Sequence, residues 1–189
     1  MKRYWSRINS AFSPTECAEI LSWGLQHKPT EGTVVTGKSD IKVEASRRCK
    51  VRWLDASKPE LTDVVARLRN YMLRANAQFF GVECSDFWNL QLTEYLAGEA
   101  GYHQWHEDSG WIEYENSMVW DRKLTAVLML SDKKSYEGGL LKLDREAMKE
   151  DFNCGDLVIF PSILKHCVEP VTAGVRHTLV AWQYGPRWR

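Results

Sequence analysis

Two histidines and one aspartate carry the chemistry that this sequence suggests most clearly. His106 and Asp108 stand one residue apart in YLAGEAGYHQWHEDS, residues 95–109. On an extended strand, residues i and i+2 point to the same side, so this imidazole and this carboxylate would converge on one point. Such a pair suits a metal ion, and one more imidazole would give a set of three ligands that leaves coordination positions open.

The third ligand is predicted at His166, in the segment FPSILKHCVEPV, residues 160–171. This segment follows an apolar run that is typical of a strand, so the ligands would come from distant strands, as they do inside a barrel. His103 is a rival ligand, but at three residues from His106 its side chain is expected on the opposite strand face. The ordinary alternative is that His106 and Asp108 form a surface hydrogen bond and that His166 is a core residue.

A cation is predicted close to this set. Arg176, Thr178, Val180 and Trp182 alternate along the next predicted strand, so their side chains share one face. If Val180 and Trp182 face the interior, Arg176 does too, and a buried guanidinium needs an anion. No acidic residue nearby is an obvious partner, which favours a small dicarboxylate ligand held in a bidentate manner. The alternative is that Arg176 ends the strand in solvent.

The elements that must position these residues fall into two blocks. Ser13 and Glu16, around Pro14, have the pattern of a capping box and predict that a helix begins there. Residues 57–60 repeat the pattern, and apolar residues then recur at helical spacing up to Phe79. Strands are predicted after this helix, at residues 87–95, 124–130, 140–143, 157–160, 166–168 and 176–184. Helices followed by strands predict an α+β fold in which an antiparallel barrel or jelly roll carries the helices on one side.

Length and charge narrow the choice of function classes. The 189 residues favour one domain over residues 1–189, large enough to enclose a pocket. The 25 basic and 25 acidic residues cancel, which argues against a nucleic-acid or membrane-surface partner. Neither a signal peptide nor a membrane span is expected. Five scattered cysteines without CxxC spacing predict free thiols in a reducing compartment, the cytoplasm of a bacterium or of a virus-infected host cell.

Four segments, in order, carry a family resemblance. They are LQLTEYLAGEAGYHQWHEDS, RKLTAVLMLSDKKSYEGGLLKL, GDLVIFPSILKHCVEPV and TAGVRHTLVAWQYGP. Together they resemble the Fe(II)- and 2-oxoglutarate-dependent dioxygenases of the prolyl 4-hydroxylase-like branch, in its compact microbial or phage forms. The resemblance covers most of residues 90–189. It implies a double-stranded β-helix (jelly-roll, cupin-like) core with N-terminal helices packed on one side.

The resemblance also implies cofactors and the residues that hold them. Fe(II), the co-substrate 2-oxoglutarate and O2 are expected, with ascorbate as a further cofactor. Carried over by position, His106, Asp108 and His166 would be the iron ligands. Arg176 would be the salt-bridge partner of the distal carboxylate of 2-oxoglutarate.

Three more positions match residues that line the co-substrate pocket in the family. Tyr95 matches a tyrosine whose hydroxyl helps to hold the distal carboxylate, Thr125 a pocket-lining residue and Trp182 a pocket-wall tryptophan. This chain carries two more residues than the usual spacing between Tyr95 and His106, so Tyr102 is an alternative to Tyr95.

The expected reaction is hydroxylation of an unactivated C–H bond with release of succinate and CO2. A proline-containing peptide is the leading substrate, as in a procollagen-proline 4-dioxygenase, because an aromatic groove suits a polyproline conformation. The long loops at residues 32–48 and 109–121 are expected to meet it. Another residue, a free small molecule or oxidative demethylation of nucleic acid are alternatives. A non-redox metal barrel and a zinc hydrolase with Glu107 as base are others, although neither needs a cation beside the metal.

Overall fold

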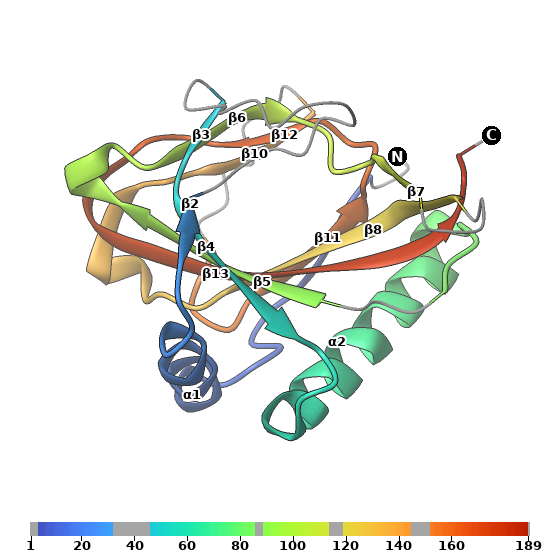
Figure 1. The fold of residues 1–189 in the computed structure, drawn as a ribbon, viewed down its shortest axis with the longest axis horizontal. Coiled ribbons are helices and arrows are strands. Elements are labelled where there is room, and N and C mark those ends of the chain that lie inside the picture. Colours follow the sequence, from blue (N-terminus) through green and yellow to red (C-terminus); the bar gives the residue numbers. More distant parts are fainter. Residues whose placement is uncertain (1–3, 32–45, 86–88, 114–118, 145–151, 189) are drawn as a thin grey trace.

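The computed structural model describes residues 4–31, 46–85, 89–113, 119–144 and 152–188. Two sheets face each other, and the two α-helices of the described residues, α1 (Pro14–Leu25) and α2 (Thr62–Ala75), cover the outer face of the larger one (Figure 1). No helix in this part of the chain is long and apolar enough to cross a membrane.

All strand pairs among the described residues are antiparallel. The larger sheet has the order β1 (Ser6–Ile8), β11 (Leu157–Pro161), β8 (Val119–Met129), β13 (Val171–Pro186), β5 (Asn89–Leu96), β4 (Lys50–Asp55) and β2 (Thr30–Glu31), with β7 (Trp111–Glu113) on β8 and β9 (Tyr136–Gly138) on β13. The smaller sheet has the order β10 (Leu141–Leu143), β12 (His166–Val168), β6 (Tyr102–His106) and β3 (Arg47–Arg48). From β5 to β13 the chain passes repeatedly between the sheets, which makes a jelly roll, so the predicted α+β fold with helices on one side is confirmed.

The first helix begins as the sequence predicts. The Ser13 side chain accepts a hydrogen bond from the Glu16 backbone N–H at 3.2 Å, and the Glu16 carboxylate accepts one from the Ser13 N–H at 2.8 Å. This is the predicted capping box, which satisfies two N–H groups that the helix itself leaves unpaired.

The second helix begins differently from the prediction. Ser57 caps no helix, because its N–H and its hydroxyl donate to Asp55 Oδ1 at 2.9 and 2.7 Å and close the turn after β4. A 3₁₀ turn, Pro59–Leu61, leads into α2 without a side-chain cap. The α-helix ends at Ala75 and a single π-helical stretch, Asn76–Phe80, follows it, so the helical segment predicted up to Phe79 is not regular α-helix throughout.

Strand alternation divides the core into two layers. The outer face of the larger sheet packs against the helices through a cluster that includes Leu54, Leu90, Leu92, Leu124, Leu128, Ile159, Leu179, Ile20, Leu68 and Met72. The inner face packs against the smaller sheet through Val51, Tyr95, Val127, Met129, Val158, Phe160, Leu141, Leu143 and Val168. Buried polar side chains also lie among the residues that line a cavity here, including Gln91, Thr125, Arg176 and Thr178, so the interior can hold a site.

Asp156 fastens the N-terminal strand to the sheet. It is 1% exposed and pairs with Arg7 on β1, whose Nη2 lies 2.7 Å from its Oδ2. It also accepts backbone hydrogen bonds from Ser10 and Asn153 at 2.9 Å each. Because all three donors meet one carboxylate, its loss would leave them without their acceptor.

Replacing Asp156 with alanine is therefore expected to lower the free energy of unfolding by about 3 kcal/mol, since it removes a buried carboxylate that accepts from one guanidinium and two backbone N–H groups. Urea unfolding at pH 7 measures this effect. Asp63→Ala, on the exposed side of α2, is the control and should cost less than about 1 kcal/mol. Equal losses in the two variants would contradict the role given to Asp156.

Candidate metal centre

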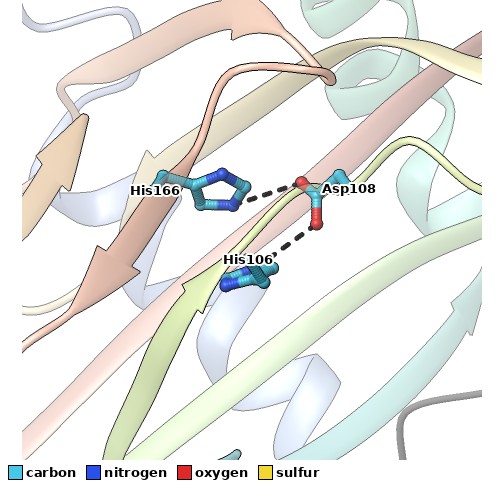
Figure 2. A group of neighbouring side chains, drawn as sticks. All are labelled: His106, Asp108 and His166. Carbon is cyan, nitrogen blue, oxygen red and sulfur yellow. Dashed lines mark ion pairs between the residues drawn. The ribbon is translucent and has the colours of Figure 1, made fainter. Parts of the chain in front are cut away.

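His106, Asp108 and His166 point toward one another from three segments that are distant or successive in the sequence (Figure 2). His106 ends β6, His166 begins β12, and the two residues pair across these strands. Asp108 lies between them, with its Oδ1 3.5 Å from His106 Nε2 and its Oδ2 3.5 Å from His166 Nε2. One potential ligand atom from each residue lies within 4.8 Å of the other two, which is close enough for all three to bind one ion.

Both imidazoles have a fixed orientation. His106 Nδ1 lies 2.7 Å from the carbonyl oxygen of Gln104, and His166 Nδ1 lies 2.9 Å from that of Leu164. A carbonyl can only accept, so each Nδ1 carries a hydrogen, and each ring turns its Nε2 toward Asp108. This is the arrangement of metal-ligating histidines, whose second nitrogen donates to the protein.

Asp108 is held by two side chains of the larger sheet. Thr125 Oγ1 on β8 and Trp182 Nε1 on β13 each donate to Asp108 Oδ2 at 2.9 Å. Ser162 supports this arrangement, because its hydroxyl lies 2.9 Å from Thr125 Oγ1 and its carbonyl accepts from the Asp108 N–H at 2.9 Å. Sequence reasoning missed Ser162, which no motif marks.

The charges of the three residues are coupled. Burial alone would raise the pKa of Asp108, but His166 and His106 outweigh it and hold that pKa well below its usual range. Burial acts to lower the pKa of His166, and the Asp108 carboxylate outweighs it and raises that pKa. The carboxylate is thus ionised and ready to bind a cation.

His103 does not lie on the opposite face from His106, and the prediction that separated them was wrong. The two rings stack with centroids 3.5 Å apart, and both line the same cavity. The reason is an irregularity in the pairing, since the three residues of β12 from His166 to Val168 oppose the four residues of β6 from His103 to His106. The extra residue is a β-bulge, and it reverses the alternation between positions 103 and 106.

A substitution of Trp182 would show how far iron binding depends on the hydrogen bonds that hold Asp108. Trp182→Phe keeps an aromatic ring but removes the donor to Asp108 Oδ2, so the affinity for Fe(II) should fall about 10- to 100-fold. Anaerobic calorimetric titration with Fe(II) measures the change. Trp23→Phe on α1, remote from Asp108, should bind Fe(II) like the wild type, and an unchanged affinity in Trp182→Phe would contradict the prediction.

Arg176 lies buried at the far end of the cavity. It is 2% exposed, its Nε has no hydrogen-bond partner, and its Nη2 meets only the sulfur of Met129, at 3.5 Å. No carboxylate of the described residues pairs with it. Gly139 makes room for it, because a Cβ there would lie 2.7 Å from Arg176 Cδ. A buried guanidinium of this kind is costly unless a ligand supplies the anion.

Tyr95 lies beside this cation and Tyr102 does not. Tyr95 pairs with Arg176 across β5 and β13, and its ring lies 5.3 Å from the guanidinium carbon. Burial raises the pKa of Tyr95, so its hydroxyl stays protonated and can donate. Tyr102 instead lies under Arg48, 5.7 Å from its guanidinium carbon, and is not among the residues that line the cavity.

One cavity of about 530 Å³, including the part that opens to solvent, joins these groups. His106, Asp108, His166, Arg176, Tyr95, Thr125 and Trp182 all line it. Thr125 and Trp182, expected to line the co-substrate pocket, also direct their polar atoms to Asp108. Of the loops expected to meet a substrate, residues 32–45 and 114–118 lie outside the described residues. Glu107 is exposed and does not line the cavity, so it is not placed as a base for a zinc hydrolase.

A family model decides the class. The model of the 2OG-Fe(II) oxygenase superfamily matches residues 90–184, slightly more than half of the chain. The chain belongs to this superfamily. Oxygenases of this superfamily use Fe(II), 2-oxoglutarate and O2, and the site fits them. Two imidazoles and a carboxylate are the donor set that leaves Fe(II) open positions, and Arg176 offers an unpaired cation for a dicarboxylate.

Relatives of known sequence are bacterial hydroxylases. The PKHD-type hydroxylase YbiX of Escherichia coli (strain 55989 / EAEC) is 29% identical over 187 residues, covering 93% of this chain and 76% of the relative. The protein of the same name from Shigella sonnei (strain Ss046) matches with the same identity and coverage.

Solved structures share the oxygenase fold. A Pseudomonas putida prolyl-4-hydroxylase has a TM-score of 0.67 at 20% identity, with 98% of this chain and 94% of that chain covered. A viral collagen prolyl hydroxylase from Paramecium Bursaria Chlorella virus-1 gives 0.70 at 16% identity, with 97% of each chain covered. A prolyl hydroxylase from Trichoplax adhaerens, in complex with a hypoxia inducible factor peptide fragment, gives 0.73 at 18% identity, with 96% and 84% covered.

Proposed function

We propose that this oxygenase hydroxylates C4 of a prolyl residue in a peptide substrate. In this proposal His106, Asp108 and His166 bind Fe(II), and Arg176 with Tyr95 binds the distal carboxylate of 2-oxoglutarate. The observation that carries the assignment is the buried, unpaired Arg176 guanidinium in the cavity that also holds the three ligands. A simple metal-binding barrel would have no use for that charge.

When bound, iron and 2-oxoglutarate supply, with O2, the oxidising power that puts one oxygen atom into a C–H bond and leaves succinate and CO2. The chain does the rest of the work. Its three ligands would occupy one face of the metal and leave the other face open. Arg176 would fix the co-substrate by two parallel hydrogen bonds, and the Tyr95 hydroxyl would donate to the same carboxylate. The sheets that enclose the cavity would limit the access of bulk water to the reacting carbon.

The proposal that the substrate residue is proline rests on the similarity of this fold to solved prolyl hydroxylases. The three solved structures described above are named as prolyl hydroxylases, and one holds a peptide, which supports a peptidyl-proline substrate here. Ascorbate belongs to the same proposal, as the reductant that keeps the iron divalent. We further propose that residues 1–189 act as one domain and work in the cytoplasm, where the five cysteines, all free of disulfides in the structure, would stay reduced.

The decisive experiment is an anaerobic titration of the wild type with Fe(II) and then 2-oxoglutarate, following the visible charge-transfer band of the chelate. The band should appear only with both present and saturate at about one equivalent of iron. Proline-containing peptides are then screened by mass spectrometry for a gain of one oxygen atom that depends on 2-oxoglutarate. A folded protein that gives no band would exclude the proposed site, whereas a band without proline oxidation would exclude only the substrate.

A further inference from the structure

Arg122 is a second cation of the cavity wall. It lies on β8 and is half-buried. Its guanidinium stacks over the Trp182 ring, 4.0 Å from the ring centre. Its Nε is buried without a hydrogen-bond partner, and no carboxylate in the described part of the chain pairs with the guanidinium. The stack occupies one face of the planar group and leaves its N–H edge able to bind an anion.

The proposed cofactors do not need this charge. Fe(II), the 2-oxoglutarate dianion, Asp108 and Arg176 together carry no net charge. Asp108 is the sole carboxylate among the described residues that line the cavity, and Arg47, which also lines it, has further contacts in the fold. The charge of Arg122 therefore stays uncompensated when the cofactors are in place, and a partly desolvated cation favours an incoming anion.

The position of Arg122 separates it from the co-substrate. Trp182, on which it stacks, lies six residues beyond Arg176 on β13, which is roughly 20 Å along a strand at 3.3 Å per residue. A five-carbon diacid that joins Arg176 to the metal cannot also reach that end. The indole N–H of Trp182 donates to Asp108, and the guanidinium of Arg122 stacks on the face of the same indole ring. The indole ring therefore lies between the cation and the proposed metal ligand.

An apolar surface adjoins the cation. Trp53 on β4 is 45% exposed, although large aromatic side chains are usually well covered, and its ring centre lies 5.9 Å from that of Trp182. It pairs in the sheet with Gln91, which lines the cavity. A ligand held here would place an acidic group on Arg122 and a small apolar body against the tryptophans.

We propose that Arg122 binds a carboxylate of the primary substrate, so that the enzyme oxidises a carbon close to an acidic group. This rests on the proposed iron and co-substrate site and narrows its substrate class. The carboxylate can be the chain end of the substrate or an acidic side chain beside the oxidised residue, and both present the same two oxygens to the guanidinium fork. A neutral, internal prolyl segment would offer Arg122 carbonyl acceptors but no opposite charge.

Matched pairs of ligands test this proposal. N-acetylproline is compared with N-acetylproline amide, and acetyl-Pro-Asp methylamide with acetyl-Pro-Asn methylamide. Each pair differs in charge and hardly in shape. Binding is measured anaerobically by calorimetry to protein loaded with Fe(II) and 2-oxoglutarate, so that no turnover occurs. In at least one pair, the acid should bind about 10- to 100-fold more tightly, as expected for charge-assisted hydrogen bonds. The pair that responds identifies the source of the carboxylate.

Variants distinguish a specific contact with Arg122 from the effect of the overall charge of the protein. Arg122→Gln should abolish the preference for the acid, and Arg122→Lys, which keeps the charge without the planar fork, should keep part of it. Arg74→Gln, exposed on α2, should keep all of it. The proposal is overturned if neither acid binds more tightly than its neutral partner, and the absence of binding by any of the four ligands counts as this result. It is also overturned if the preference for the acid survives in Arg122→Gln.

The chelate band, recorded before each calorimetric run, tells two failures apart. It should form in the wild type and in Arg122→Gln with similar 2-oxoglutarate dependence. A missing wild-type band counts against the proposed iron and co-substrate site, whereas a normal band without any preference for acids counts against Arg122 alone.

Discussion

His166→Ala should show no Fe(II)–2-oxoglutarate charge-transfer band at any concentration that the wild type needs for saturation. His166 is 5% exposed, and the carbonyl of Leu164 orients its ring so that Nε2 faces Asp108, whereas the methyl group of alanine offers no ligand atom there. Losing a direct ligand should exceed the 10- to 100-fold effect of an outer partner, and we expect on the order of 1000-fold weaker iron binding.

His27→Ala is the matched control, because it removes an imidazole at the end of α1, outside the cavity lining. It should give the wild-type band, and circular dichroism should show both variants folded. A full band in His166→Ala would mean that other groups bind the iron, and His103, whose ring stacks on that of His106, would be the first to test.

Arg176→Met should have two effects of opposite sign. At saturating Fe(II), 2-oxoglutarate should bind at least about 100-fold more weakly, because the distal carboxylate loses a desolvated charge pair. Without ligands, the variant should unfold at the same temperature as the wild type or a higher one, because an uncompensated buried cation has been replaced by an apolar side chain of similar length.

Thermal unfolding with and without 2-oxoglutarate measures both effects. Addition of the co-substrate and iron should raise the melting temperature of the wild type and leave that of Arg176→Met nearly unchanged. Arg176→Lys should lie between them, since an ammonium keeps the charge but not the bidentate geometry. Normal 2-oxoglutarate binding with a lowered melting temperature would show that Arg176 is structural.

Local backbone geometry explains which parts of the site could be predicted from the sequence. The direction of side chains along a strand follows from the strand alone, so Arg176 and Trp182 could be placed on one shared face without knowing the neighbouring strands. The capping box at Ser13 and Glu16 is equally local, because both partners lie within one helical turn. The positive charge of Arg176 then indicated an anionic ligand, since no carboxylate close in sequence could pair with it.

Features that depend on pairing between strands could not be predicted. The bulge that turns His103 toward His106 appears only when β6 is aligned with β12. The hydroxyl of Ser162 reaches Thr125 because β11 pairs with β8, and Ser57 lost its expected capping role to a local contact with Asp55. These outcomes depend on register and on competition between acceptors, neither of which a single sequence displays.

β13 has a consequence for how this enzyme can change. Its 16 residues carry both Arg176, the proposed anchor of the co-substrate, and Trp182, which donates to Asp108, and it is hydrogen-bonded to β5 and β8 over the stretch between them. The number of residues between Arg176 and Trp182 is therefore fixed by this pairing. Inserting one residue between Arg176 and Trp182 would turn one of the two side chains to the outer face of the sheet. A change of co-substrate would therefore require exchanged side chains on β13, because a longer segment between these residues would misplace one of them.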